Sequence, residues 1–167
     1  MKSIFLTGAS GFVGENLISN LKGRFLINKC VKREEIKIYE EFVVHLAGKA
    51  HNLKFLGNLD EYYQVNTGLT QNVFDAFLDS DAKVFITFSS VKAVADGVIG
   101  ELTEEAFANP VTHYGKSKLL AEQYILSKEI PKGKRVYILR PCMIHGQGYP
   151  SEPTLQFSVK RISLAFR

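Results

Sequence analysis

A strand, a glycine turn and a helix are predicted in immediate succession at the start of this 167-residue chain. Ser3–Thr7 is an apolar run suited to a buried strand. Gly8, Gly11 and Gly14 follow at three-residue spacing, and the next residues carry apolar side chains at helical spacing. Such glycines allow a tight turn, a close approach of a pyrophosphate and close packing of helix on strand. The pattern therefore favours a dinucleotide site at a helix N-terminus over an ordinary βα turn.

Buried strands and amphipathic helices alternate along the rest of the chain. We expect strands at Phe25–Val31, Phe42–Leu46, Val84–Phe88 and Arg135–Leu139, and helices at Tyr62–Leu78 and Thr112–Lys128. This alternation predicts an α/β fold, a doubly wound parallel sheet of the Rossmann type in three layers. We assign residues 1–149 to this NAD(P)-binding domain. Residues 150–167 form an expected irregular tail, the remnant or truncated start of a substrate-binding region.

The connection after the second strand is unusually short. Only Lys32–Glu41 separates this strand from the next, which is barely enough for one crossover. Ile36-Lys-Ile38 as a vestigial third strand and Glu34–Glu41 as a short helix are the two alternatives for this segment. We therefore expect the sheet to be trimmed on this side.

A tyrosine and a lysine four residues apart carry the predicted chemistry. Tyr114 and Lys118 would lie on one face of the same helix, one turn apart. A neighbouring ammonium lowers the pKa of a phenol by about 1–3 units, which suits proton exchange with an alcohol at neutral pH. A serine hydroxyl from a strand end would orient the same substrate oxygen. The structural alternative is a half-buried aromatic residue beside a solvated charge, and the other motifs argue against it.

The order of these motifs resembles the extended short-chain dehydrogenase/reductase family, in its NAD-dependent epimerase/dehydratase branch. The glycine pattern of Thr7–Gly14 is followed by matching blocks at Val43-Val-His-Leu-Ala47, Val65-Asn66, Phe88-Ser-Ser90, Tyr114-x-x-x-Lys118 and Leu139-Arg-Pro141 with His145-Gly-Gln-Gly148. The chain looks most like nucleotide-sugar epimerases and dehydratases of bacterial polysaccharide biosynthesis. Relatives continue beyond Gly148 into a smaller substrate domain, most of which we expect this chain to lack.

The resemblance implies a role for each matching residue. Ser90 would be the catalytic hydroxyl, Tyr114 the general acid/base, and Lys118 its electrostatic partner and a ligand of the nicotinamide ribose. Asn66 would support Lys118, or alternatively cap the helix that it begins. Further cofactor contacts are expected from Gly8, Ser10, Gly11, Phe12, Val13, Gly14, Lys32, Arg33, Leu46, Ala47, Gly48, Ser89 and Pro141. His45 is expected to be a buried, hydrogen-bonded residue, and His113 a surface residue.

The choice between NAD and NADP depends on the end of the second strand. An acidic residue there favours NAD, whereas Lys32 and Arg33 suit a 2′-phosphate. Glu34 and Glu35 follow closely, and the family resemblance favours NAD, so both cofactors remain alternatives.

Composition restricts the class of protein. With 46% hydrophobic and 23% charged residues, the chain has the composition of a cytoplasmic globular domain without a membrane span. Its net charge of +4 comes from scattered basic residues, so no nucleic-acid partner is expected. The histidines lack ligand spacing for a metal, and Cys30 and Cys142 are expected to be reduced core residues.

Two functions from different classes follow from these patterns. The first is an enzyme, an isomerase or related oxidoreductase that uses tightly bound NAD(P) and a Ser-Tyr-Lys site on a nucleoside-diphosphate sugar. The alternative is a catalytically inactive or regulatory dinucleotide-binding fragment. Without a substrate domain, the end of the sheet would expose apolar area, which favours a homo-oligomer or docking of the tail.

Overall fold

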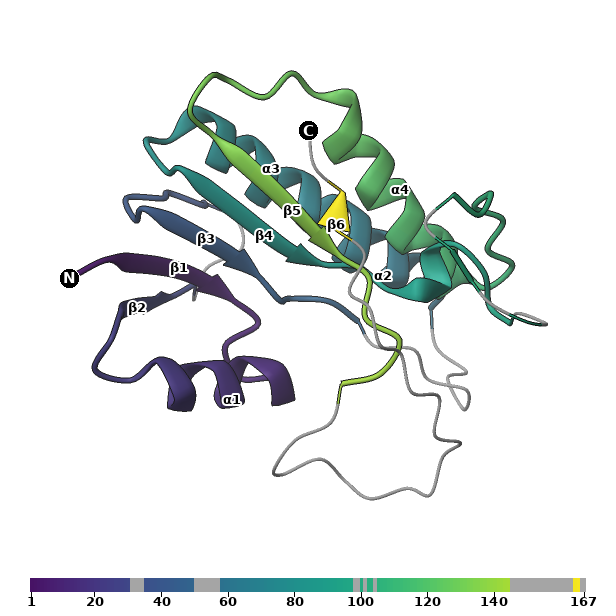
Figure 1. Ribbon diagram of the computed structural model, residues 1–167, viewed down its shortest axis with the longest axis horizontal. Helices are drawn as coiled ribbons and strands as arrows, with labels where there is room; N and C mark the ends of the chain where they lie inside the picture. The colour runs from purple at the N-terminus through teal and green to yellow at the C-terminus, as the bar shows by residue number, and fades with distance from the viewer. Residues whose placement is uncertain are drawn as a thin grey trace.

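The computed structural model describes residues 1–30, 35–49, 58–97, 100, 102–103, 105–144 and 164–165. A six-stranded sheet with the order β2-β1-β3-β4-β5-β6 lies at its centre (Figure 1). The first five strands are parallel, and β6 pairs antiparallel with β5. The strands are β1 (Ser3–Thr7), β2 (Leu26–Lys29), β3 (Phe42–His45), β4 (Val84–Phe88), β5 (Arg135–Leu139) and β6 (Leu164–Ala165). The predicted parallel sheet is confirmed, and β6 adds two tail residues to its edge.

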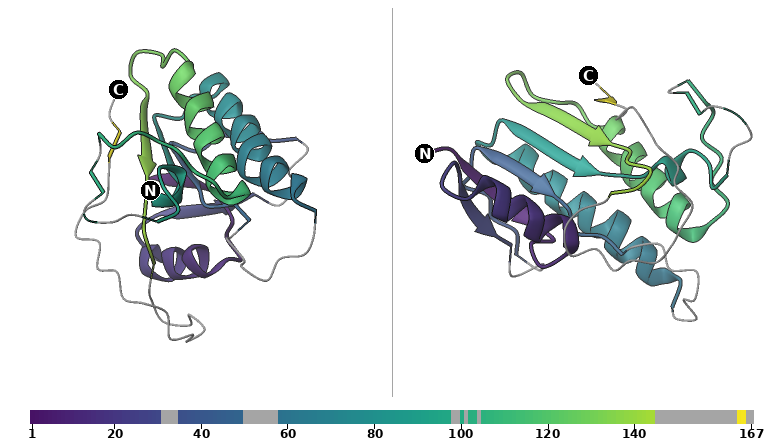
Figure 2. Two further views of the ribbon diagram at one scale, coloured as in Figure 1. Left: turned by 90° about the vertical axis from the view of Figure 1, so that its right-hand side faces the viewer. Right: turned by 60° about the horizontal axis from the view of Figure 1, so that its bottom comes forward.

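Helices cover both faces of the sheet, as predicted. Helix α1 (Phe12–Leu21) lies on one face, and α3 (Leu69–Asp79) and α4 (His113–Ser127) lie side by side on the other (Figure 2). A short α2 (Asp60–Tyr62) and a π-helical turn η1 (Tyr63–Gly68) lead directly into α3, and a 3₁₀ turn η2 (Val91–Ala93) follows β4. The fold therefore has the three layers of a doubly wound protein.

Alternate side chains of each strand enter the two cores. Phe5, Val43 and Phe85 face α3 and α4, where Phe74 and Phe77 are fully buried. The rings of Phe74 and Phe85 have centroids 5.0 Å apart in an edge-to-face arrangement. The strand residues next to these, including Ile4, Leu6 and Val44, pack beneath α1. Continuous apolar strands are thus explained by burial on both faces.

The crossover from β2 to β3 differs from both sequence alternatives. Residues 35–41 form neither a third strand nor a helix, while Glu34 lies outside the described residues. The segment must pass β1 to join strands on either side of it, which leaves no length for a further element. Ile38 is buried against the α3/α4 face, and Glu40 accepts a hydrogen bond from Asn28 Nδ2 at 2.6 Å. The trimmed side of the sheet is therefore covered partly by the connection itself.

Most predicted boundaries agree with the structure to within two residues. The strand expected at Phe25–Val31 is shorter, with Val31 outside the described residues, and the strand expected at Phe42–Leu46 ends at His45. The helix expected at Tyr62–Leu78 begins at Asp60 and contains η1, which the 3.6-residue periodicity does not reveal. Thr112 is the N-cap of α4, where its hydroxyl accepts a hydrogen bond from Gly115 N at 3.1 Å.

Candidate functional site

Several of the predicted site residues lie in segments that directly follow the carboxyl ends of the parallel strands, where open α/β sheets bind ligands. The glycine loop follows β1, and residues 46–49 follow β3. Ser89 and Ser90 follow β4, and Arg140 and Pro141 follow β5. Backbone bonds from Ser89 N to Leu139 O (2.7 Å) and from Val91 N to Pro141 O (3.3 Å) hold the last two segments together. Pro141 thus lies beside the serine segment, as its predicted role requires.

The glycine loop has the geometry of a phosphate site. Gly8 has a φ of +69°, and Gly11 N donates to Gly8 O at 3.1 Å to close the turn. Gly11 is the N-cap of α1 and has no side chain to satisfy the first N–H groups of the helix. Ser10 and Gly11 are exposed, whereas Gly14 is buried. An anion can therefore approach the exposed start of α1, and Phe12 and Val13 lie in this first turn.

A chain of hydrogen bonds connects the end of β1 with the helix that follows β3. Thr7 Oγ1 accepts from Ala47 N at 3.1 Å and so donates to His45 Nδ1 at 2.7 Å. Thr70 Oγ1 donates to Asn66 O at 2.7 Å, and therefore accepts from His45 Nε2 at 2.9 Å. His45 is then the neutral Nε2–H tautomer, and burial, together with the charge of Lys118, lowers its pKa to about 3. His45 is buried and hydrogen-bonded, as predicted.

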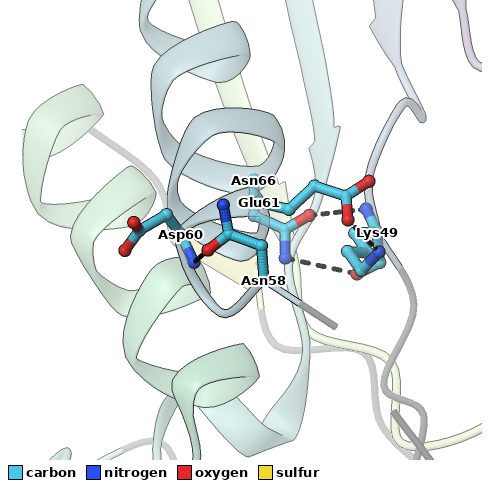
Figure 3. A network of polar contacts seen from close by, with 5 residues as sticks. All are labelled: Lys49, Asn58, Asp60, Glu61 and Asn66. Carbon is cyan, nitrogen blue, oxygen red and sulfur yellow. Dashed lines mark hydrogen bonds and ion pairs between the residues drawn. The ribbon is translucent and has the colours of Figure 1, made fainter. Parts of the chain in front are cut away.

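Asn66 lies fully buried within the π-helical turn η1. Its Oδ1 accepts from Lys49 N at 2.8 Å, and its Nδ2 donates to Lys49 O at 3.2 Å (Figure 3). Nδ2 also donates to Ser117 Oγ on α4 at 3.0 Å. The helix-capping alternative is therefore wrong, because Asn66 lies in the middle of a continuous helical segment. Its amide instead ties η1 to α4 and to the segment that follows β3.

Gly48 lies where this segment passes the site. A Cβ atom on Gly48 would lie 3.1 Å from Asn66 Oδ1 and 3.2 Å from Lys118 Nζ, so both polar groups face the same side of the glycine. The next residue, Lys49, pairs through Nζ with Glu61 Oε2 at 2.5 Å, and Asn58 Oδ1 accepts from Asp60 N beside it (Figure 3).

Ser90, Tyr114 and Lys118 are brought together by α4 and the end of β4. Tyr114 has a side-chain hydrogen bond with Ser90, and its ring meets the edge of Tyr62 at 6.2 Å. Lys118 Nζ donates to Phe88 O at 2.9 Å. Gly115 allows α4 to lie close to η2, because a Cβ at this position would lie 2.3 Å from Lys92 O in η2.

Burial dominates the electrostatics of this group. It raises the pKa of Tyr114 above the usual value, although the hydrogen bond with Ser90 acts in the opposite direction. The expectation that Lys118 would lower this pKa is therefore wrong for the protein without its cofactor, because desolvation of the phenolate is the larger effect. Burial also lowers the pKa of Lys118 to about 8, and the Glu122 carboxylate opposes that shift.

Ser89 has a buried hydroxyl group that is not satisfied by any hydrogen bond in the described part of the chain. The residue is 8% exposed, and its Oγ has no hydrogen-bond partner among the described residues. It borders a cavity of about 10 Å³ that Asn66, Lys118 and Glu122 also line, enough for one water at most. An unsatisfied buried hydroxyl in the same small cavity as Lys118 is an observation expected where a polar cofactor group binds.

The remaining predicted contacts divide into two groups. Leu46 and Ala47 directly follow β3 at the same sheet edge, in agreement with their predicted place. Lys32 and Arg33, on which the argument for NADP depends, lie outside the described residues. His113 is exposed on α4, as predicted, and its Nδ1 is 3.0 Å from Tyr63 Oη. In the described part of the chain, no group of three or more metal-ligating side chains gathers.

Sequence reasoning missed three polar residues that shape the site. Ser117 is fully buried and donates to Tyr114 O at 2.8 Å, while Glu122 is buried against Arg140. Glu122 continues the four-residue spacing of Tyr114 and Lys118, which was an available signal. Asn66, the second partner of the Ser117 hydroxyl, and Glu122, the partner of Arg140, are distant in sequence from these residues, and no local pattern indicates the two contacts.

The fold and this site together define a Rossmann-type dinucleotide-binding protein. Residues 31–165 match the model of the NAD dependent epimerase/dehydratase family, and the chain belongs to this family, which uses NAD or NADP. It is 32% identical to a UDP-glucose 4-epimerase of Vibrio cholerae over 88% of this chain and 53% of that protein. The chain thus spans about half the length of the curated relatives it matches.

Solved structures confirm the fold. MoeE5 in complex with UDP-glucose and NAD superposes with a TM-score of 0.69 at 21% identity, over 81% of this chain and 52% of that one. RMD from Pseudomonas aeruginosa, complexed with NADPH, has a TM-score of 0.73 at 25% identity, over 90% and 57% of the two chains. None of the helices in the described ranges is long and apolar enough to cross a membrane.

Proposed function

We propose that this chain provides the cofactor-binding and proton-transfer half of a nucleotide-sugar epimerase or dehydratase. The observation that carries the proposal is the hydrogen-bonded pair of Ser90 and Tyr114 beside a half-buried Lys118, at the same sheet edge as the glycine loop. The relatives named for UDP-glucose support a nucleoside-diphosphate sugar as the substrate.

The bound nicotinamide would accept and return a hydride at the sugar carbon. Ser90 would hold the reacting sugar hydroxyl by a hydrogen bond, and Tyr114 would exchange the hydroxyl proton. In the protein without cofactor the phenol is protonated, because burial raises the pKa of Tyr114. Lys118 would stabilise the phenolate once the site is filled, and Asn66 would keep the neighbouring backbone in place.

The contacts of the cofactor would come from the loops described above. The exposed N-terminus of α1 suits the pyrophosphate, and the unsatisfied hydroxyl of Ser89 and the ammonium of Lys118 suit the nicotinamide end. Lys118 has three N–H donors, of which Phe88 O accepts one.

Conservative substitutions test the proposal. Tyr114→Phe removes one hydroxyl and keeps the ring packed, so we expect turnover of UDP-glucose or a related sugar nucleotide to fall by about 10²–10⁴ while cofactor affinity stays nearly constant. Lys118→Ala is expected to lower both. Turnover that is unchanged per folded molecule in Tyr114→Phe would exclude the proposed chemistry. Cofactor binding without turnover in the parent protein would instead favour a dinucleotide-binding protein that is catalytically inactive.

A further inference from the structure

Three ionisable residues form a row along the sheet-facing side of α4. Tyr114, Lys118 and Glu122 follow one another at four-residue spacing, so they lie on one face of the helix. Each reaches a different point of the sheet edge. Tyr114 bonds with Ser90, Lys118 with the last carbonyl of β4, and Glu122 with the residue that follows β5. The proposed function uses only the first two members of this row.

Glu122 is a buried carboxylate that accepts hydrogen bonds from two nitrogen atoms of Arg140. The side chain of Glu122 is 3% exposed, and that of Arg140 is 24% exposed. Arg140 Nε donates to Glu122 Oε1 at 3.0 Å and to Oε2 at 3.1 Å, and Arg140 Nη2 also donates to Oε2. Such a forked arrangement fixes the plane of the carboxylate as well as its position. Glu122 therefore has little freedom to turn towards another cation.

The carboxylate of Glu122 nevertheless faces the same part of the site as Lys118. Both side chains line the small cavity beside Ser89, yet no ion pair within 4.0 Å joins these two described residues. A charge fixed in a buried region acts over a longer distance than it would in water. A direct ion pair would occupy N–H groups of Lys118 that the proposed site needs for Tyr114 and the cofactor.

We propose that Glu122 is a positioning residue for Lys118: its charge supports the buried ammonium through space, while Arg140 restrains it from forming a direct ion pair. This inference rests on the proposed function only in taking Lys118 as the partner of Tyr114. With Glu122 held in this way, Lys118 stays charged and keeps N–H groups available for Tyr114 and the cofactor.

The surroundings of Lys118 make Glu122 the decisive charge. Burial lowers the pKa of Lys118 to about 8, and Glu122 acts to raise it. From β3, His45 is neutral, because its own pKa is lowered to about 3, and from α4 the phenol of Tyr114 is protonated. Arg140 is a second cation. The other polar groups that line the cavity are neutral and come from η1, α3, β4 and the residue after β4, namely Asn66, Thr70, Thr87 and Ser89.

Two substitutions separate this role from ordinary packing, because they are expected to shift Lys118 in opposite directions. Glu122→Gln keeps the shape and a hydrogen-bond acceptor but removes the charge, so the pKa of Lys118 should fall by about one unit, a tenfold change in proton affinity. Arg140→Lys keeps a positive charge but loses the forked grip, so Glu122 can turn to Lys118 and raise that pKa. Glu129→Gln, which removes an exposed carboxylate just beyond α4, is the matched control and should change nothing.

The measurement is the titration of Lys118 by carbon NMR of ¹³C-labelled lysine in the whole chain, with the signal assigned through Lys118→Arg. A fall in Glu122→Gln and a rise in Arg140→Lys support the inference. Equal shifts in the same direction, or an unchanged titration in Glu122→Gln, overturn it. Should Arg140→Lys not fold, Arg140→Gln replaces it with the same expected rise.

The titration does not depend on turnover, so the two proposals can fail separately. Opposite shifts without any turnover of a sugar nucleotide would leave the inference standing and sink the proposed function. In a protein that does turn over, the alkaline limb of the pH–rate profile should move to lower pH in Glu122→Gln. Turnover that depends on Tyr114 but shows no such movement would overturn the role of Glu122 alone.

Discussion

Two glycines of the first loop, only three residues apart, are expected to respond in opposite ways to a side chain. Gly11 has φ −85° and ψ 165°, an extended conformation that valine adopts readily. A Cβ on Gly11 would meet only Gly8 O, at 3.4 Å. A Cβ on Gly14 would lie 2.2 Å from Gly8 O and 2.8 Å from Ala9 Cα, which are backbone atoms. A side chain therefore has room at Gly11, the open position, but not at Gly14, the closed position.

These distances set the expected magnitudes. Gly11→Val loses a favourable N-cap residue, which costs about 1 kcal/mol of unfolding free energy. Gly14→Ala gains about 1 kcal/mol of helix propensity, but overpacking against backbone costs about 3 kcal/mol, so a net loss of about 2 kcal/mol is expected. For the cofactor the order is reversed. A valine at the open position would lie where a pyrophosphate must approach, and each lost charge-assisted hydrogen bond weakens binding by about tenfold or more.

Urea unfolding and calorimetric binding of NAD and NADPH measure the two effects separately. We expect Gly11→Val to fold almost as stably as the parent and to lose cofactor binding, with Gly11→Ala intermediate. Gly14→Ala should unfold at a lower urea concentration and retain binding in its folded fraction. Cofactor affinity in Gly11→Val equal to that of the parent would refute the assignment of this loop. Equal destabilisation of the two variants would refute the contrast between an open and a closed position.

Three further outcomes follow from burial and charge. Phe74→Ala should lower the free energy of unfolding by about 3–5 kcal/mol in urea titrations, because the ring is fully buried against Phe85. The pKa of His45 is about 3 in the folded protein, below its unfolded value of about 6.5. The contribution of neutral His45 to the free energy of unfolding is therefore fully present above pH 6.5. It should decline by about 1.4 kcal/mol per pH unit as the pH falls towards 3, and His45→Gln should flatten this slope. Partial burial acts to raise the pKa of Asp96, but hydrogen bonds from the Thr112 side chain and backbone hold it below its usual value. Asp96→Asn should therefore lose stability at pH 7 and show less acid destabilisation below about pH 4.

The strands and the outer helices could be predicted because their sequences repeat local rules. The runs Val84–Phe88 and Arg135–Leu139 are short and rich in β-branched and aromatic residues, which favours strands, and their observed bounds are the predicted ones. Helix α4 was expected to start at Thr112, and it begins one residue later because the Thr112 hydroxyl caps it. Local patterns sufficed where local physics decides the structure.

The crossover and the π-helical turn were not predictable in the same way. The path of residues 35–41 depends on the position of β3 beyond β1, a fact of topology rather than of local sequence. Asn66 belongs to η1, whose extra residue per turn lets its side chain reach both Lys49 and Ser117. Periodicity predicts a helix there but does not distinguish the two kinds of turn.

The pKa values at the site show why its chemistry was only half predictable. Spacing alone places Tyr114 and Lys118 on one face, and from it we expected a lowered phenol pKa. Burial, which spacing does not reveal, raises that pKa instead and lowers that of Lys118. Glu122 continues the same spacing, but a glutamate on a helix is ordinarily solvated, so the pattern alone favours a surface role. Only its contact with Arg140, eighteen residues away, shows that the row has a third member. The proton-transfer pair that we propose would therefore depend on a counter-charge that the motif itself does not contain.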